Sequence, residues 1–403
     1  MNLQSIKLNK AFWFQEGPGV RKWQFTDQGV KLLNVANILK TGIIDLSKTD
    51  RHLAIEEVES KYSHFLADDG DLVIASSGIS IDDDGFLKTR GAFIENKHLP
   101  LCMNTSTIRF KTIDGISDLC FLKHWLQSFE FRSQITREVT GIAQKNFGPS
   151  HLKRLSISLP SLPEQKRIAA ILDAADALRA KRRESLDQLD ALLKSTFLDM
   201  FGDPVTNPKD WKTVPFNKIG KFVSGSTPSK AREDFWNGSV PWVSPKDMKV
   251  ARIFDSQDHI SDQALKETNI KLLAPGYLLI VVRGMILAHS FPIATNNVPV
   301  TINQDMKGIY PSPLSEVNFL LECIRLSKRQ ILFEVSTAGH GTRRFDAEAM
   351  KKIMIPLPPL THQHRFEKIA ESIENQKSRL RAHLAELDTL FASLQSRAFK
   401  GEL

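Results

Sequence analysis

The sequence predicts an α/β protein in which two globular α/β domains are separated by two long helices. The helices are expected to form an antiparallel coiled coil with an internal pseudo-twofold repeat. Three observations predict this fold: a gapless repeat, a long apolar stripe in each copy, and two mixed strand-and-helix regions that mostly differ. The expected boundaries are 1–155 for the first domain, 156–204 for the first repeated region, 205–353 for the second domain and 354–403 for the second repeated region.

The repeat is found by shifting the sequence by 198 residues. This shift lays 141–201 over 339–399 without a gap, and 17 of 61 positions are identical. ISLPSLPEQKRI, from Ile157, corresponds to IPLPPLTHQHRF, from Ile355. The shared residues Leu159, Pro160, Leu162, Gln165 and Arg167 recur as Leu357, Pro358, Leu360, Gln363 and Arg365. Unrelated segments do not keep register over this length, so the chain contains a duplicated unit.

Each copy begins with a strand-like run that ends in prolines, LKRLSISLP or MKKIMIPLP, and continues into a long helix. The apolar spacing of three and four residues is typical of a coiled-coil stripe. The predicted stripe positions are Ile168, Ile171, Ala175, Leu178, Arg182, Leu186, Leu189, Leu193, Thr196 and Met200, then Phe366, Ile369, Ile373, Gln376, Leu380, Leu384, Leu387, Phe391, Leu394 and Ala398. About 37 residues give a helix roughly 55 Å long, which needs a partner helix. Two helices that each pack only on their own domain are the alternative.

The two globular regions correspond in a few places. VKLLNVANI from Val30 parallels VPWVSPKDM from Val240, and DGDLVIASSG from Asp69 parallels PGYLLIVVRG from Pro275. Each region mixes short β-branched runs and turns with one helix-like stretch, FLKHWLQSF or NFLLECIRL. Elsewhere the regions diverge, which predicts one scaffold with two different surfaces.

The net charge of +8 is unevenly distributed. The stretch 164–200 has seven basic and seven acidic residues, and 361–400 has seven and five. Most of the basic excess therefore lies outside the helices, where a polyanion would be bound; a role in solubility alone is the alternative. Cys102, Cys120 and Cys323 lie far apart, which indicates neither a disulfide framework nor a zinc site.

The sequence lacks the motifs of several other protein classes. The first residues do not form a signal peptide and no run approaches a membrane span, so we expect a cytoplasmic protein. There is no methyltransferase cofactor loop, no Asn-Pro-Pro-aromatic tetrapeptide and no P-loop. The acidic run 82–84, and Glu95 near Lys97, are better explained as solvated turns than as nuclease carboxylates. His362 and His364 lack further ligands, which favours a helix start over a metal site.

The order of these parts resembles the specificity subunits of type I restriction–modification enzymes. Further similar pieces are VSGSTPSK from Val223, FWNGSVPWV from Phe235, STAGHGTRRF from Ser336 and the final AFKGEL. The first domain departs from this pattern. Its EGPGVRKWQF, from Glu16, lacks the STPSK, WNG and PWV pieces, which weakens residue-level inference in the first half.

The resemblance implies a non-catalytic DNA-reading subunit whose two target-recognition domains each read half of a bipartite target. The repeated helices would space the halves and dock two methyltransferase subunits, which modify adenine at N6 with S-adenosylmethionine. Restriction subunits would complete an ATP- and Mg-dependent nuclease, and this chain itself would bind no cofactor or metal. Because the domains differ, we expect an asymmetric target. Two alternatives stay open: the specificity subunit of a related enzyme with one fused methylation and cleavage partner, and a helical scaffold that binds proteins rather than DNA.

Polar and basic loop residues are the candidates for DNA contact, because base edges and phosphates are bound by such side chains. In the second domain the predicted contacts are Gly339, Gly341, Thr342, Arg343 and Arg344, then Arg283, His289, Asn303 and Gln304, then Ser226, Thr227 and Lys230. In the first domain they are Ser76, Ser77, Gln144, Lys145, Asn146, Lys88 and Arg90. Ordinary polar loop residues are the alternative for each.

Overall fold

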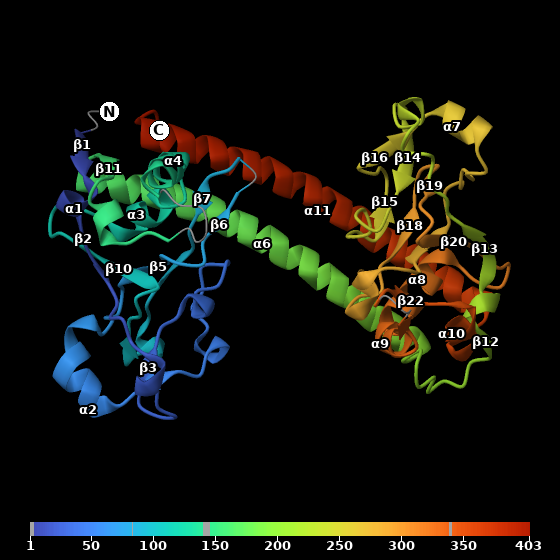
Figure 1. The fold of residues 1–403 in the computed structure, drawn as a ribbon, viewed down its shortest axis with the longest axis horizontal. Helices are drawn as coiled ribbons and strands as arrows, with labels where there is room; N and C mark the ends of the chain where they lie inside the picture. Colours follow the sequence, from blue (N-terminus) through green and yellow to red (C-terminus); the bar gives the residue numbers. More distant parts are fainter. Residues whose placement is uncertain (1–3, 83, 140–145, 338–340) are drawn as a thin grey trace. The chain divides into compact units, whose positions relative to one another are not determined.

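The computed structural model describes residues 4–82, 84–139, 146–337 and 341–403, which divide into two compact units. Unit 1 comprises Met1–Arg183 and Ala382–Leu403, and unit 2 comprises Glu184–Arg381. Each unit contains one α/β region and part of each long helix, α6 (Leu162–Phe201) and α11 (Leu360–Lys400) (Figure 1). Among the described residues, no helix combines the length and apolarity needed to cross a lipid bilayer.

Unit 1 is built on a four-stranded antiparallel sheet with a smaller mixed sheet beside it. The large sheet has the order β2 (Phe12–Glu16), β10 (Thr107–Thr112), β5 (Leu72–Ala75), β8 (Gly91–Phe93). The small sheet has the order β4 (His52–Leu53), β3 (Val30–Leu32), β9 (Leu101–Cys102), with β3 and β9 parallel. Two strand pairs are added, β1 (Gln4–Lys7) with β11 (Ser156–Leu159) and β6 (Ser80–Ile81) with β7 (Leu87–Lys88). The α-helices of the α/β region are α1 (Leu8–Ala11), α2 (Ile55–Glu57), α3 (Leu119–Trp125), α4 (Phe129–Glu138) and α5 (Pro149–Leu152).

Unit 2 has a similar pair of sheets. The large sheet has the order β13 (Gly220–Ser224), β20 (Met306–Pro311), β17 (Leu278–Val281), β18 (Ile293–Asn296), β15 (Arg252–Ile253). The small sheet has the order β16 (Asp258–Ile260), β14 (Val240–Val243), β19 (Thr301–Ile302), with β14 and β19 parallel. The added pairs are β12 (Thr213–Pro215) with β23 (Met354–Pro356) and β21 (Ser336–Thr337) with β22 (Arg343–Arg344). The helices are α7 (Asp262–Glu267), α8 (Val317–Leu326), α9 (Lys328–Phe333) and α10 (Ala347–Lys352).

The two units therefore share one topology. The order β2-β10-β5-β8 matches β13-β20-β17-β18, and the parallel pair β3–β9 matches β14–β19. The central strands β5 and β17 are the continuous apolar runs LVIA and LLIV, and both are fully buried, as strands covered on both faces require. The predicted correspondence of Val30 with Val240 is confirmed, because these residues begin β3 and β14.

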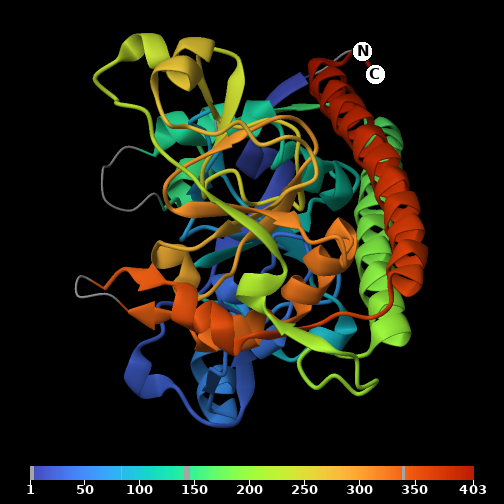
Figure 2. The ribbon, with the colours of Figure 1, turned by 90° about the vertical axis from the view of Figure 1, so that its right-hand side faces the viewer.

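The long helices are antiparallel, as predicted, and lie side by side in both views (Figures 1 and 2). They contain 40 and 41 residues, or roughly 60 Å each. In unit 1, the Arg179 Nε donates to the Asp388 carboxylate at 2.6 Å, and in unit 2 the Lys377 Nζ donates to Asp190 at 2.6 Å. The 198-residue shift converts each partner of one pair into its counterpart in the other, so the duplication extends to the charges that join the helices.

The predicted apolar stripe is wrong at one position in each copy. Leu178 is 56% exposed, and its counterpart Gln376 is also exposed. The next residue takes the inward position in each copy, and Lys377 is only 2% exposed. A long basic side chain can bury its methylene groups while its charge reaches an acid on the facing helix. Pairing with Asp388 and Asp190 therefore decides which residues face inward at this point.

A buried glutamine attaches each α/β region to the start of a long helix. The Gln165 side chain is fully buried; its Oε1 accepts from the Asp118 N–H at 3.0 Å, and its Nε2 donates to the carbonyls of Ile116 at 2.8 Å and Pro160 at 2.9 Å. The side chain of Gln363 makes the same three bonds, to Glu316, Leu314 and Pro358. The repeat thus extends upstream to Ile116 and Leu314, beyond the part that sequence identity alone shows.

Candidate nucleic-acid interface

In unit 2, the three groups of predicted contact residues meet at one edge of the large sheet. Strands β13 and β17 end at this edge and β20 begins there, because Ser224 pairs with Lys307 and Val281 pairs with Met306. The unit 2 edge consists of the loops 225–230, 282–289 and 303–305 together with the described parts of the β21–β22 hairpin.

Backbone hydrogen bonds hold these loops together. The Arg283 N–H donates to the Asp305 carbonyl at 3.2 Å, and the Gly284 N–H donates to the Arg343 carbonyl at 3.0 Å. The φ of Gly284 is 135°, a conformation that favours glycine. The Thr227 hydroxyl also bonds the Gln304 side chain, so the first, second and third predicted groups form one continuous surface.

The side chains at this edge differ in how far they are available. Arg283, Arg344, Gln304, Lys230 and His289 are exposed, whereas Ser226, Thr227, Thr342 and Arg343 are half-buried. The Arg343 Nη1 donates to the Thr337 hydroxyl at 2.7 Å, and this bond holds the arginine side chain across the hairpin. Gly341 is exposed with a φ of 77°, and Gly339 lies outside the described residues.

Asn303 is not exposed at the unit 2 edge but supports the loop 303–305 from inside. Its side chain is buried, and its Oδ1 accepts from the Asp305 N–H at 3.1 Å. Asp346 has a similar role below the hairpin, where it accepts from the Ala349 N–H at 2.9 Å. That backbone bond, followed by a weaker one from Ser336, lowers the pKa of Asp346, so its carboxylate stays charged beside Arg344.

Unit 1 repeats this framework at the end of β5. The Ser76 N–H donates to the Ser106 carbonyl at 2.9 Å, as the Val282 N–H does to Asp305. The Phe147 N–H donates to the Ser76 carbonyl at 3.0 Å, and Phe345 bonds Val282 in the same way at 2.9 Å. Ser76 therefore corresponds to Val282 and is buried, which makes it part of the frame. Its neighbour Ser77 takes the place of Arg283.

The other candidates in unit 1 lie around this frame. Lys88 is exposed on β7, and Arg90 is half-buried where its carbonyl accepts from the Ala75 N–H at 2.9 Å. Asn146 is exposed directly before Phe147, while Gln144 and Lys145 lie outside the described residues. In the acidic run, Asp82 accepts from the Phe86 N–H at 2.8 Å and pairs with Arg132, as expected of a turn.

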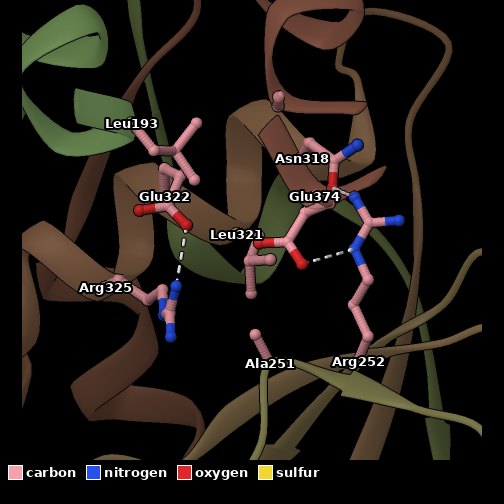
Figure 3. A pocket seen from close by; sticks show the side chains of 9 residues that line it. Leu193, Ala251, Arg252, Asn318, Leu321, Glu322, Arg325 and Glu374 are labelled. Carbon is pink, nitrogen blue, oxygen red and sulfur yellow. Dashed lines mark hydrogen bonds and ion pairs between the residues drawn. The ribbon is translucent and has the colours of Figure 1, made fainter. Parts of the chain in front are cut away.

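A small pocket lies where the α/β region of unit 2 meets its helices (Figure 3). It is lined by Leu193, Ala251, Arg252, Asn318, Leu321, Glu322, Arg325, Ala370 and Glu374. Its volume of about 10 Å³ is the space of roughly one water molecule, so this pocket cannot hold a nucleotide-sized cofactor. Its charges are paired, with Arg252 to Glu374 at 3.8 Å and Arg325 to Glu322 at 2.9 Å. The pocket is a charged joint between β15, α8 and α11.

A family model described as the type I restriction modification DNA specificity domain matches residues 30–189 and 208–387. The two matches cover most of the chain, one in each copy of the repeat. The chain belongs to this family. The resemblance inferred from the order of the motifs is thereby confirmed.

Within the specificity-domain family, this chain is 32% identical over 232 residues to the specificity subunit of the Escherichia coli type I restriction enzyme EcoR124I/EcoR124II. The match covers 55% of this chain and 56% of that relative. The chain thus spans about half the length of the curated relatives it matches.

Two solved structures share the fold of this family member. The S subunit of a type I restriction–modification system from M. genitalium has a TM-score of 0.59 and 15% identity, and the likeness covers 99% of this chain and 96% of that one. A chain from a study of complex assembly and conformational transition of the type I R-M system has a TM-score of 0.51 and 17% identity, with 100% and 98% covered. These likenesses bear out the predicted arrangement of two α/β domains and two long antiparallel helices.

Sequence reasoning missed the residues that frame both edges, Asp305 and Ser106, because they act through backbone carbonyls. It identified Gln165 and Gln363 as recurring residues but not their role. The sequence feature that could have indicated this role is a glutamine that recurs at the start of both predicted helices. A long amide side chain at that place can form hydrogen bonds with three backbone groups at once.

Proposed function

We propose that this chain is the DNA-reading subunit of a type I restriction–modification complex and has no catalytic residue of its own. Residues 1–155 and 205–353 are its target-recognition domains, and 156–204 and 354–403 carry the spacer helices. The observation that carries this proposal is that one edge framework occurs in both units with different side chains on it. Such a chain would direct a cell's defence against foreign DNA to one sequence.

The two edges are suited to different bases. The same backbone position holds Arg283 in unit 2 and Ser77 in unit 1. An arginine can form two hydrogen bonds with a guanine in the major groove, whereas a serine makes one bond with little preference among bases. The two half-sites therefore differ, and the target is asymmetric, with half-site centres about one helical turn (roughly 10 base pairs) apart.

The contact residues divide into those that reach DNA and those that shape the edge. Arg283, Arg343, Arg344, Thr342, Gln304, His289, Thr227, Ser226 and Lys230 reach the DNA from unit 2, with Gly339 and Gly341 allowing close approach of the backbone. Ser77, Lys88, Arg90, Gln144, Lys145 and Asn146 do so from unit 1. Asn303 and Ser76 hold the loops in place.

Two methyltransferase subunits dock on the helical regions, and restriction subunits complete the enzyme. The duplication supports two copies of one partner, because Leu192 and Leu390 are equivalent under the 198-residue shift and are 50% and 49% exposed. S-adenosylmethionine, ATP and Mg belong to these partner subunits.

Salt dependence of duplex binding tests this proposal against a protein-binding scaffold. The chain, with its methyltransferase partner, is titrated with labelled duplex DNA at several salt concentrations. A DNA reader displaces counterions, so its affinity should fall roughly 10³- to 10⁵-fold between 50 and 200 mM salt if six to ten phosphates are contacted. No measurable duplex binding at low salt would contradict the proposal and favour the scaffold.

A further inference from the structure

The loop that follows β2 in unit 1 begins at the same point of the fold as the loop that follows β13 in unit 2. The Gly17 N–H donates to the Thr107 carbonyl at 3.2 Å, and the Gly225 N–H donates to the Met306 carbonyl at 3.3 Å. Both glycines lie against the backbone of a turn that begins with an asparagine. A Cβ on Gly17 would lie 2.4 Å from the backbone nitrogen of Asn104, and a Cβ on Gly225 would lie 2.0 Å from the backbone carbonyl oxygen of Asn303. Only glycine fits at these contacts, so EGPGVRKWQF and VSGSTPSK are structural counterparts despite their different sequences.

The unit 1 loop presents two cations and an aromatic ring to solvent. Arg21 and Lys22 are exposed, and Trp23 is 82% exposed. Among the described residues, no carboxylate lies within ion-pair distance of either cation. In unit 2 the corresponding loop carries Ser226, Thr227 and Lys230, so the two units present different chemistry from one position.

The turn that carries Trp23 is anchored on its inner side. Its 3₁₀ helix, η1 (Lys22–Gln24), ends at the buried Gln24, whose Nε2 donates to Glu57 at 2.7 Å and to the Tyr62 hydroxyl at 2.9 Å. The Arg21 N–H donates back to the Gln24 Oε1 at 2.8 Å. These bonds hold residues 21–23 outward, so the exposed ring does not result from a loosely tethered loop.

We infer, on the basis of the proposed function, that Arg21, Lys22 and Trp23 form a DNA-contacting element of the first recognition domain and help to set its half-site. The two cations bind phosphates, and the indole packs against base edges or sugars in the groove. A tryptophan buries about 150–250 Å² in such a contact, which would explain a large apolar ring held in water in the free chain.

The test is methylome sequencing of cells that express the full chain with its methyltransferase partner. The variants are Trp23→Ala and Arg21→Ala/Lys22→Ala. Lys10→Ala is the matched control, because Lys10 is an exposed cation next to the opposite end of β2. Trp23→Phe keeps an aromatic ring. Since all these side chains are exposed, thermal unfolding of the purified complexes should match the wild type.

We expect Trp23→Ala to relax the motif in one half only, with roughly a 10- to 100-fold loss of discrimination there, measured with duplexes substituted at each position. That half should be the one that Arg343→Ala/Arg344→Ala leaves unchanged. Trp23→Phe should retain most of the discrimination, and Lys10→Ala all of it. An unchanged motif, relaxation of the other half, or loss of association with the methyltransferase subunit would each overturn the assignment. A wild-type chain that yields no motif would instead overturn the proposed function, and the assignment with it.

Discussion

At the scale of single residues, the paired arginines of the β21–β22 hairpin are the most direct candidates for base reading in unit 2. Arg344 is exposed, and Arg343 is directed by its bond to Thr337. Replacing both with alanine should weaken recognition of one half-site only, since each bidentate contact is worth about 1–3 kcal/mol of discrimination. Methylome sequencing of the variant would show this as degeneracy in one half of the motif. Loss of both halves, or of neither, would show the hairpin to be structural.

Glu367 gives unit 2 a pH-dependent stability. Burial raises the pKa of its carboxyl from 4.5 to about 7, and nearby Glu316 and Glu371 add to this. The Asn318 amide donates to Oε1 at 2.6 Å, while Oε2 is buried without a hydrogen-bond partner among the described residues. At a pH between 4.5 and about 7, the carboxyl of Glu367 holds a proton in the folded chain but has released it in the unfolded chain. The stability of the folded chain therefore falls as the pH rises toward 7 and does not fall further above it.

The variant Glu367→Gln should remove this dependence. We expect it to be more stable than the wild type at pH 8 by about 1 kcal/mol, after allowance for the solvent that reaches a half-buried carboxyl, and nearly equal to it at pH 5. Denaturant unfolding at the two pH values measures the difference. Glu386→Gln, at an exposed position of α11 that does not contribute to the shift at Glu367, is the control and should show little change. A gain of equal size at both pH values would contradict the titration argument.

At the scale of elements, the two buried glutamines determine how each long helix begins. Replacing Gln363 with alanine would leave a buried backbone N–H and two carbonyls without their partner. We expect a loss of about 3 kcal/mol in the stability of unit 2, visible as a lower thermal midpoint. Gln376→Ala, at an exposed position of the same helix, is the matched control. If both variants unfold at the wild-type temperature, the glutamine does not hold the junction.

The long helices and the α/β regions were predictable from the sequence, and the detail of their packing was not. Apolar spacing and the repeat predicted α6, α11 and the strands that begin at Val30 and Val240. Apolar spacing could not predict that Arg179 and Lys377 point toward the facing helix. Their orientation depends on aspartates of that helix, which are about 190 to 210 residues away in the sequence. Leu178 was for that reason wrongly placed in the stripe.

At the scale of the whole molecule, duplication explains how one chain carries two α/β units with the same topology and different edge side chains. The sequence predicted contact residues in unit 2 that the fold brings to one edge. It could do so because the motifs of the second domain resemble those of the specificity-subunit family. It did not indicate residues 21–23 as contacts, because the first domain lacks those motifs. The correspondence between the loop that carries these residues and the loop after β13 appears only in the backbone contact of Gly17 with Asn104. Frame residues such as Ser76 were predicted as contacts because burial is not readable from a polar loop sequence.

The spacer helices give a further prediction at this scale. Inserting four residues after Glu184 in α6 and after Ala382 in α11, which are equivalent positions, adds one turn, about 6 Å, to each helix. The preferred spacer between the half-sites should lengthen by about one to two base pairs. Methylation motifs of the wild type and the variant measure this, and an unchanged spacer would contradict the role of the helices as a ruler.

The most direct measurement for the central claim is methylome sequencing of cells that express the methyltransferase partner with and without this chain. We expect N6-methyladenine at one bipartite, asymmetric motif, and only when this chain is present. A palindromic motif would contradict the claim that the two edges read different half-sites. Methylation that does not depend on the chain would contradict its role as the subunit that reads DNA.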